Sequence, residues 1–331
     1  MTLKFNNVYL NETAAVAGFI EARNPIGPYF DKTYKDYYMG DNDSVEYSEV
    51  VMQKDAMNIL FNKTDLSFSN IDLFLGGDLQ NQIAASCYSF DNYSAPFLGL
   101  YSACATSIEE LIIASNFIDS NSIKRAICNV SSHNLASEKQ YRNPIEYGAL
   151  KPNTATFTST GATSVLLSGD KKGVKVSAGT IGSIYNFNQK DPNHMGAAMA
   201  YAAAETIYEH LKETNTSVSD YDLILTGDLG LYGSAILRDY MLDKYKIKLD
   251  NHNDCGIMLY DIRKEPDISA GGSGPVCSAL VNFSYIFSLL KKKEIARVML
   301  VATGALFNPT FLYQKHPILG ISHAVTLEVI K

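Results

Sequence analysis

The sequence lacks the cysteine spacing of a disulfide framework or a zinc site. Its five cysteines are odd in number and widely separated, with no CxxC pair and no histidine at zinc spacing: Cys87, Cys104, Cys128, Cys255 and Cys277. This pattern argues for reduced thiols. We therefore expect no bound metal, and nothing in the sequence indicates a cofactor.

Basic residues are too few for a nucleic-acid-binding protein. Lysine and arginine total 28 against 35 aspartate and glutamate residues, so the formal charge is −7. Clustered basic residues are the usual footprint of DNA or RNA binding, and we expect no nucleic-acid partner. The remaining composition, 46% apolar, 19% charged and 11% aromatic, excludes a disordered, collagenous or coiled-coil chain and indicates a globular core.

No apolar run is long enough to cross a bilayer. The two strongest stretches, residues 298–307 and 279–290, are too short, and the second is interrupted by Asn282 and Ser284. The opening residues do not place an apolar core behind a cationic start, as a secretory signal would. We expect a chain without a transmembrane segment that is made and kept on the cytoplasmic side.

An internal repeat is the most informative feature of the sequence. Residues 72–79 read DLFLGGDL and residues 222–229 read DLILTGDL, so six of eight positions match at a separation of 150 residues. The match extends backwards without a gap through one threonine and two serines in each copy: Thr64, Ser67 and Ser69, then Thr214, Ser217 and Ser219. Each copy follows a predicted helix, residues 51–63 in the first and 196–213 in the second.

Two further pairs of segments continue the repeat. A small-residue turn, a buried helix and a Val/Ile-rich strand follow one another from residue 102 and again from residue 269, and residues 162–168 and 324–330 each add a closing strand. This order predicts an α/β protein with two pseudo-two-fold-related halves, whose mostly parallel central sheets are covered by helices. We place the first half at residues 1–170 and the second half at residues 171–331.

Cys104 stands in one of these small-residue turns, at the predicted start of the helix 108–118. Duplicated α/β folds place their chemistry where turns leave the carboxyl ends of strands. Free N–H groups and the helix dipole at this position favour a thiolate or a bound anion. The alternative is that the small residues only let a buried helix approach its neighbours.

Two other strand exits carry polar residues. The first follows the predicted strand 126–130 and consists of Ser131, Ser132, His133 and Asn134. These side chains offer donors to a small anion, or alternatively satisfy the backbone of their own turn. At the second exit stand Asp78, Asn81 and Gln82, although an aspartate there more often caps a helix than binds a ligand.

Other catalytic templates are missing from the sequence. It contains no P-loop, no HExxH, no GxSxG and no pair of carboxylates at a catalytic spacing. Three lysines at 291–293 follow a buried helix and indicate a solvated helix end, or at most a weak surface for an anionic lipid or a partner.

The turn ACATS before a buried helix resembles the nucleophile turn of thiolases and ketoacyl synthases, whose cysteine accepts an acyl group. The whole chain resembles the SpoVAD family of spore-forming bacteria, a family with the thiolase fold. The segments that carry this resemblance run from near residue 27 to the C-terminus: FDKTY (30–34), GDLQNQ (77–82), SACATS (102–107), SSHN (131–134), EYGALKPNTAT (146–156), DP with MG (191–196), YDLILTGDL (221–229), DCGIMLY (254–260), AGGSG with CSA (270–279) and VATGAL with PT (301–310). The resemblance implies a five-layer αβαβα fold.

The resemblance also shows which catalytic groups are missing. Besides the cysteine, an acyl-transferring enzyme of this fold needs a histidine and an asparagine or second histidine, from turns that match residues 226–230 and 270–274. These turns read TGDLG and AGGSG, and an anionic Asp228 would oppose a developing oxyanion. His323, which we place in the last turn before the closing strand, is the remaining substitute, and a capped surface histidine is the favoured alternative.

A non-catalytic binding protein is the function that the resemblance implies. Its ligand is dipicolinic acid, or the calcium chelate, taken up into the developing spore. Its partners are membrane-embedded SpoVA proteins at the spore's inner membrane, where the chain is expected to be peripheral, and a homodimer stays open. The implied ligand site comprises Cys104 as the nucleophile equivalent, with Ser131, Ser132, His133, Asn134, Asp78, Asn81, Gln82, Ser273 and His323. The alternative is an acyl-CoA-handling thiolase or synthase that uses Cys104.

Overall fold

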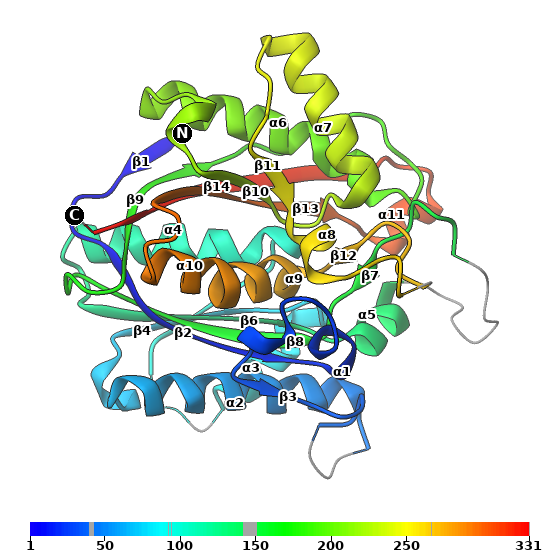
Figure 1. Cartoon of the computed structure of the whole chain (residues 1–331). Coiled ribbons are helices and arrows are strands. Elements are labelled where there is room, and N and C mark those ends of the chain that lie inside the picture. The colour runs from blue at the N-terminus through cyan, green and yellow to red at the C-terminus, as the bar shows by residue number, and fades with distance from the viewer. Residues whose placement is uncertain (40–42, 92, 94, 142–150, 266, 331) are drawn as a thin grey trace.

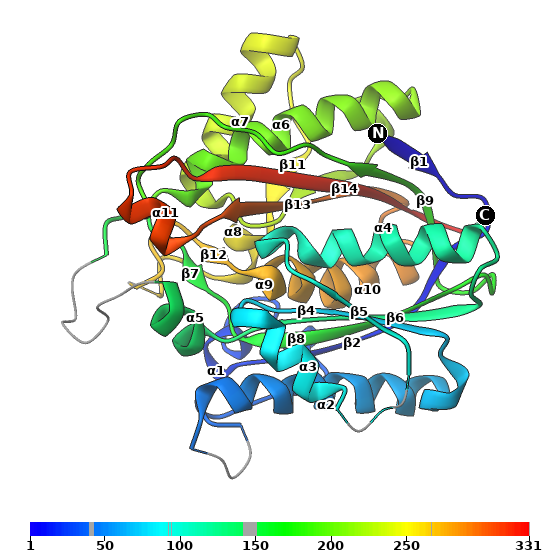
Figure 2. The same cartoon turned by 180° about the vertical axis from the view of Figure 1, so that it is seen from behind.

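Five alternating layers of helices and sheet make up the molecule, as Figures 1 and 2 show from opposite sides. The structure is a computed structural model that describes residues 1–39, 43–91, 93, 95–141, 151–265 and 267–330. Residues 146–150 of the motif at 146–156 lie outside the described residues. The layers confirm the predicted α/β arrangement.

The sheet of the first half contains β2 (Tyr9–Ala17), β4 (Leu73–Gly77), β5 (Phe97–Leu100), β6 (Arg125–Ser132) and β8 (Gly161–Ser168). These strands lie in the order β5-β4-β6-β8-β2. β4 pairs in parallel with β5 and β6, whereas β8 runs antiparallel to both of its neighbours. Only β8 therefore runs against the other four strands in this described set.

The sheet of the second half repeats this topology with β9 (Val174–Ile181), β10 (Leu223–Thr226), β11 (His252–Asp254), β13 (Arg297–Leu306) and β14 (Leu319–Val329). The order is β11-β10-β13-β14-β9, and β14 runs against the others. β4 and β10, which contain the repeated motif, both lie second from the edge between parallel neighbours. The equivalence predicted for these two strands is confirmed.

The two sets of strands meet at one edge, which the sequence did not predict. Tyr9 and Leu10 of β2 pair with Lys175 and Val174 of β9, and β1 (Thr2–Lys4) and β3 (Lys32–Thr33) extend the same sheet. A separate parallel pair joins β7 (Phe157–Thr158) to β12 (Gly272–Ser273) across the halves. The boundary at residue 170 falls in the turn between β8 and β9, and its role as a domain boundary stays a prediction.

Helices cover both outer faces and fill the space between the sheets (Figure 1). α2 (Val45–Thr64) and α3 (Ala84–Ser89) lie outside the first half, and α6 (Met195–Thr214) and α7 (Gly230–Tyr245) lie outside the second half. The middle layer contains α4 (Thr106–Asp119) and a helix built of α9 (Pro275–Leu280), a π-helical turn (Val281–Ile286) and α10 (Phe287–Lys291). The largest apolar core surrounds these middle helices.

Short helices lie near the strand ends: α1 (Phe19–Ala22), α5 (Asn134–Tyr141), α8 (Cys255–Leu259) and α11 (Pro309–Tyr313). Among the residues that the structure describes, no helix has both the length and the apolar character needed to cross a membrane.

The repeat is visible in single hydrogen bonds. α2 and α6 each end on a left-handed residue, Asp65 with φ of 55° and Asn215 with φ of 56°. The carboxylates of Asp72 and Asp222 each accept two consecutive backbone N–H groups just before or at the start of the neighbouring strand. The two halves therefore share local geometry as well as strand order.

Gly77, the last residue of β4, lets the start of α4 pack closely against the carboxyl end of that strand. A Cβ atom at this position would lie 2.3 Å from the Thr106 side chain and 2.7 Å from the Leu100 carbonyl oxygen, so a larger residue would separate β4 from α4. The small residue therefore positions the Cys104 turn at the carboxyl ends of the strands.

Candidate functional site

Cys104 lies in a tight turn between β5 and α4. Residues Ala103–Ala105 form a 3₁₀ turn, in which Ala103 has a φ of +50°, a left-handed conformation that is uncommon outside glycine. Thr106 closes the turn, because its Oγ1 accepts the Ser102 N–H at 3.1 Å and donates to the Ala103 carbonyl at 2.7 Å. The thiol is half-buried at the start of a central helix, where the sequence predicted it.

A buried carboxylate from the second half faces this thiol. Asp228 follows β10 and accepts hydrogen bonds from Ser273 Oγ at 2.8 Å, the Gly274 N–H at 3.3 Å and Thr303 Oγ1 at 2.6 Å. The Cys104 thiol lies 3.8 Å from Ser273 Oγ, the same hydroxyl that donates to Asp228. Asp228 therefore joins the two second-half turns to the cysteine.

The electrostatics of this group favour a neutral thiol. Burial, followed by the charge of Asp228 and its hydrogen bond, raises the pKa of Cys104 well above its usual value. Burial also raises the pKa of Asp228, and the neighbouring Cys104 thiol and the hydroxyls of Thr303 and Ser273 lower it in part. Desolvation and the neighbouring carboxylate therefore oppose the effect of the helix N–H groups, which favour a thiolate or a bound anion at this position.

Asp254 holds the Asp228 turn in place. Its carboxylate accepts the Leu229 and Gly230 N–H groups at 2.9 and 3.0 Å and the Thr226 hydroxyl at 2.7 Å. Burial raises the pKa of Asp254 to about 6. Asp254 and Thr303 were not predicted as site residues, although Asp254 begins the motif DCGIMLY and Thr303 lies in VATGAL.

The residues Ser131, Ser132, His133 and Asn134 end β6 and begin α5, and all four are buried. Ser131 donates to Glu49 at 2.7 Å, Ser132 donates to the Ser159 carbonyl at 2.8 Å, and the Asn134 amide donates to the Thr158 carbonyl at 3.0 Å. Of these, Ser132 lies nearest the site, because its Oγ is 2.9 Å from where a Cβ of Gly274 would be.

His133 is held as a neutral imidazole. Its Nε2 lies 2.9 Å from the Tyr37 carbonyl oxygen, and burial lowers the pKa of His133 to about 4. An uncharged ring cannot attract an anion by charge, so its direct contribution to a ligand would be a hydrogen bond.

Of the polar residues predicted to follow β4, Asp78 is buried, whereas Asn81 and Gln82 are exposed. Asp78 is buried and accepts the Ser86 N–H and hydroxyl at 2.8 and 2.7 Å, so it acts as a local cap at α3. Asn81 and Gln82 are exposed, and Gln82 has a φ of +62°. These two residues are the accessible members of this group.

A rim of tyrosine and glutamine lies beside Cys104. The hydroxyls of Tyr101 and Tyr141 lie within hydrogen-bond distance of each other and of the Leu79 carbonyl oxygen, and the Gln140 side-chain amide donates to the same carbonyl at 2.7 Å. Burial and the bond to Tyr101 raise the pKa of Tyr141, and the nearby Cys104 acts in the same direction. This rim was not predicted from the sequence, because the end of β5 and α5 meet only in the folded chain.

His323 lies within β14, paired with Ala302 and Ile181, rather than in a turn before that strand. It is buried, its Nδ1 accepts the Gly182 N–H at 3.2 Å, and Nε2 has no hydrogen-bond partner among the described residues. Burial lowers the pKa of His323 to about 4. Both the turn placement and the surface alternative are therefore wrong, since the strand begins earlier than the sequence indicated.

No group of three or more histidine, cysteine, aspartate or glutamate side chains in the described part of the chain is arranged to hold a metal ion.

A cysteine at the start of a central helix, facing turns from a repeated second half, defines the thiolase-like class of α/β proteins. Solved structures of this class align over almost the whole chain. 3-Oxoacyl-[acyl-carrier-protein] synthase III from Aquifex aeolicus VF5 gives a TM-score of 0.54 at 13% identity, covering 99% of this chain and 100% of that chain. A cysteine-to-alanine variant of Xanthomonas campestris OleA gives 0.64 at 11% identity, with 98% of both chains covered. At these identities the likeness shows the fold alone.

The chain belongs to the family described as Stage V sporulation protein AD (SpoVAD), which matches residues 1–328. Stage V sporulation protein AD of Bacillus subtilis (strain 168) is 41% identical over 322 residues, which cover 97% of this chain and 94% of that protein. The resemblance found in the sequence is thereby confirmed, and membership of this family gives the protein a role in sporulation.

Proposed function

We propose that the protein binds dipicolinic acid, or its calcium chelate, beside Cys104 and does not transfer acyl groups. The observation that carries the non-catalytic part is the buried Asp228 carboxylate beside Cys104, linked to the thiol through Ser273 Oγ, which lies 3.8 Å from the sulfur and donates to Asp228 at 2.8 Å. A nucleophile needs a base that removes its proton and releases a thiolate, whereas Asp228 raises the pKa of the thiol.

The second-half turns support the same conclusion. Acyl transfer passes through a tetrahedral oxyanion, and the loss of one donor to that oxyanion typically lowers the rate ~10²- to 10³-fold. In place of imidazole and amide donors, these turns supply the Asp228 carboxylate and the Ser273 hydroxyl, which already donates to it. A negative charge at this position would repel the oxyanion.

The same charge favours the chelate over the free ligand. Dipicolinate carries two carboxylates, and a buried acceptor such as Asp228 opposes a dianion in its neighbourhood. In the calcium chelate the cation balances both carboxylates, so this repulsion is removed. Hydroxyl and amide groups of Tyr101, Gln140 and Asn81 at the edge could then bond to ligand oxygens.

The proposed setting is uptake of the ligand into the developing spore. We propose that the protein acts with SpoVA membrane proteins as a peripheral component at the inner spore membrane, as the family resemblance implies. A homodimer is part of the same proposal. The assignment of Ser131, Ser132, His133, Asn134, Asp78, Gln82 and His323 to the ligand site also stays a proposal.

Calorimetric titration with dipicolinate, with and without calcium, tests the binding. We expect saturable binding that is tighter with calcium, and a loss of affinity in Cys104→Ala. Cys87→Ala is the matched control, because Cys87 is an exposed cysteine outside the Cys104 turn. Equal affinity in Cys104→Ala and the unmodified chain would place the ligand elsewhere.

An acyl-CoA-handling enzyme is the alternative, favoured by the position of Cys104 at the start of α4. Such an enzyme would become acylated at Cys104 by an acyl-CoA. A binding protein would take up dipicolinate reversibly and leave the thiol unmodified.

A further inference from the structure

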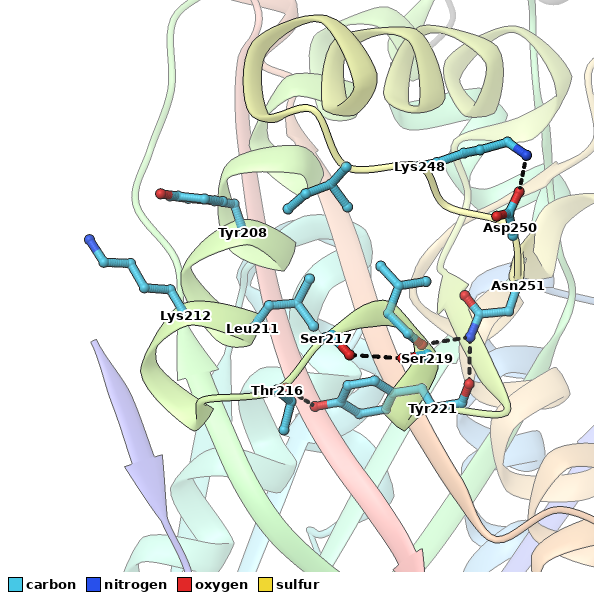
Figure 3. A pocket seen from close by; sticks show the side chains of 12 residues that line it. Tyr208, Leu211, Lys212, Thr216, Ser217, Ser219, Tyr221, Lys248, Asp250 and Asn251 are labelled. Atoms are coloured by element: carbon cyan, nitrogen blue, oxygen red, sulfur yellow. Dashed lines mark hydrogen bonds and ion pairs between the residues drawn. The ribbon is translucent and has the colours of Figure 1, made fainter.

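A cavity of about 760 Å³ opens on the second half (Figure 3). Its lining residues precede β10 and β11, whereas Asp228, which lies near Cys104, follows the opposite end of β10. The cavity lies between the C-terminal turns of α6, the turn that precedes β10, and the segment 247–251 that leads into β11. Its lining includes the apolar and aromatic side chains of Tyr208, Leu211, Val218, Tyr221 and Ile247, together with lysines and hydroxyl groups. The volume lies within the ~300 to 1,000 Å³ typical of small-molecule sites.

The internal repeat shows what fills the equivalent place in the first half. Leu211 and Val218 correspond to Phe61 and Phe68 at the 150-residue separation. The Phe61 and Phe68 rings lie 4.4 Å apart, and Phe68 stacks on Tyr93 with centroids 3.5 Å apart and planes 12° from parallel. Three aromatic rings therefore close the first-half position.

The backbone that carries these side chains is the same in both halves. The Ser67 N–H donates to the Asn70 side chain at 2.8 Å, and the Ser217 N–H donates to Asp220 at 2.7 Å, in matching capping boxes. The difference is therefore in the side chains. Smaller aliphatic residues in the second half leave open a space that planar rings occupy in the first.

Charge at the cavity indicates which kind of ring would enter. Lys212 and Lys248 both line the cavity, and Lys248 bonds to Asp250 at 2.6 Å. Figure 3 shows the two lysines on different sides of the opening. Two cations and one carboxylate leave a net positive charge among the lining residues, which favours an anionic ligand.

We propose that this cavity binds a planar aromatic carboxylate, with its ring where Phe68 and Tyr93 stack in the first half and its carboxylate near Lys212. This site is separate from the proposed dipicolinate site beside Cys104. Stacking on Tyr208 and contact with Leu211 and Val218 would hold the ring, since aromatic rings prefer offset or edge contacts with one another. Tyr208 is itself fixed by stacking on Tyr245 at 3.9 Å.

Benzoate is the probe, because it carries the ring and one carboxylate without the chelating groups of dipicolinate. In calorimetric titration of the full chain we expect saturable binding, and weaker binding of the non-planar cyclohexanecarboxylate. Val218→Phe restores the ring of the first half and should weaken benzoate at least ~10-fold. Lys212→Met, an exposed change that leaves the fold intact, should also weaken it.

Matched controls come from the segment between β9 and α6, which contributes no residue to the lining of the cavity. Ile184→Phe adds the same ring and Lys190→Met removes the same charge at exposed positions, and both should bind benzoate as the unmodified chain does. No saturation up to ~10 mM benzoate, or equal affinity in Val218→Phe and Lys212→Met, would overturn the proposal. Dipicolinate binding that depends on Cys104 but survives Val218→Phe would leave the proposed function intact in that case.

Discussion

Two electrostatic effects compete at the sulfur of Cys104. The first N–H groups of α4 favour a negative charge, as the sequence alone suggests. Burial and Asp228 favour the protonated form, and their effect on the pKa of Cys104 is the larger. We therefore expect a protonated Cys104 thiol at neutral pH, although the turn has the shape of a nucleophile site.

Alkylation measures this balance directly. We expect iodoacetamide to modify Cys104 slowly near neutral pH, with a rate that still rises above pH 9 because the thiol is not yet ionised. Asp228→Asn removes the opposing charge and should raise the rate at neutral pH by ~10-fold for each pKa unit recovered. Peptide mass spectrometry follows Cys104 separately from the other cysteines.

Exposed Cys87 serves as the internal reference in the same digest. Asp228→Asn should leave its rate unchanged. Rapid labelling of Cys104 at pH 7 in the unmodified chain would contradict a protonated thiol.

Local sequence was enough to find Cys104 but not the groups that control it. The Cys104 turn is recognisable from the six consecutive residues SACATS. The hydrogen bonds that Asp228 accepts come from Ser273 and Thr303, which are 45 and 75 residues away in the sequence. The sequence did identify Asp228 as unsuited to acyl chemistry. It could not show that Asp254 fixes that turn, because nothing in the spacing of the two aspartates predicts their contact.

At the scale of single elements, the repeated capping boxes provide a paired test. Ser67→Ala and Ser217→Ala each remove a serine that caps the short turn before β4 or β10. We expect both to lower the free energy of unfolding by about 1 kcal/mol, because the same bonds are lost in each. Denaturant unfolding of the two variants checks this.

The comparison between the two variants is its own control. Similar losses support structural equivalence of the halves in solution. A large loss in one variant and none in the other would show that one cap is not formed as described.

Long periodic elements were predictable, and short or buried ones were not. α4 and α6 lie within two residues of their predicted bounds, whereas α2 begins at Val45, six residues before the predicted start at residue 51. β5 escaped notice because it has four residues and partly exposed side chains. His323 was misplaced because the polar residues 322–323 look like a turn, although β13 and β9 pair on both sides of them.

At the scale of the whole molecule, polar contacts join the two halves. Glu21 accepts a hydrogen bond from Tyr260 and the Thr160 N–H, and the Arg23 guanidinium makes a two-pronged ion pair with Glu265 at 2.6 and 2.8 Å. The five-layer order was predictable from the repeat, whereas these contacts were not, because they join residues about 240 positions apart.

Glu21 makes stability depend on pH. Burial is the main cause that raises the pKa of Glu21 from 4.5 to about 7, against the lowering effect of its hydrogen bonds. The folded chain therefore holds this proton more tightly than the unfolded chain, and the stabilisation present below pH 4.5 is lost as the pH rises through 7. The loss is on the order of 3 kcal/mol.

Glu21→Gln should reduce the fall of the unfolding free energy between pH 4.5 and 7.5, because the amide stays neutral at every pH. Unfolding free energies of the variant and the unmodified chain, measured between pH 4.5 and 7.5, test this. Glu294→Gln changes an exposed glutamate and should leave the slope as it is. An unchanged slope in Glu21→Gln would show that this carboxyl is charged in the folded state.

Membrane association is a further prediction for the whole molecule. If the protein is a peripheral component that acts with SpoVA membrane proteins, as proposed, the purified chain should not float with lipid vesicles on its own. Vesicles that carry SpoVA membrane proteins should retain it. Firm flotation with protein-free vesicles would contradict the requirement for a partner.

The central claim is that a thiolase fold here binds a ligand without acyl-transfer chemistry, and incubation with acetyl-CoA and longer acyl-CoAs tests it most directly. Release of free CoA and the intact mass of the protein are followed together. The account predicts CoA release at the background rate and an unmodified mass, because Asp228 opposes both the thiolate and the oxyanion. Multiple turnovers that disappear in Cys104→Ala would contradict it and show that the protein is an enzyme.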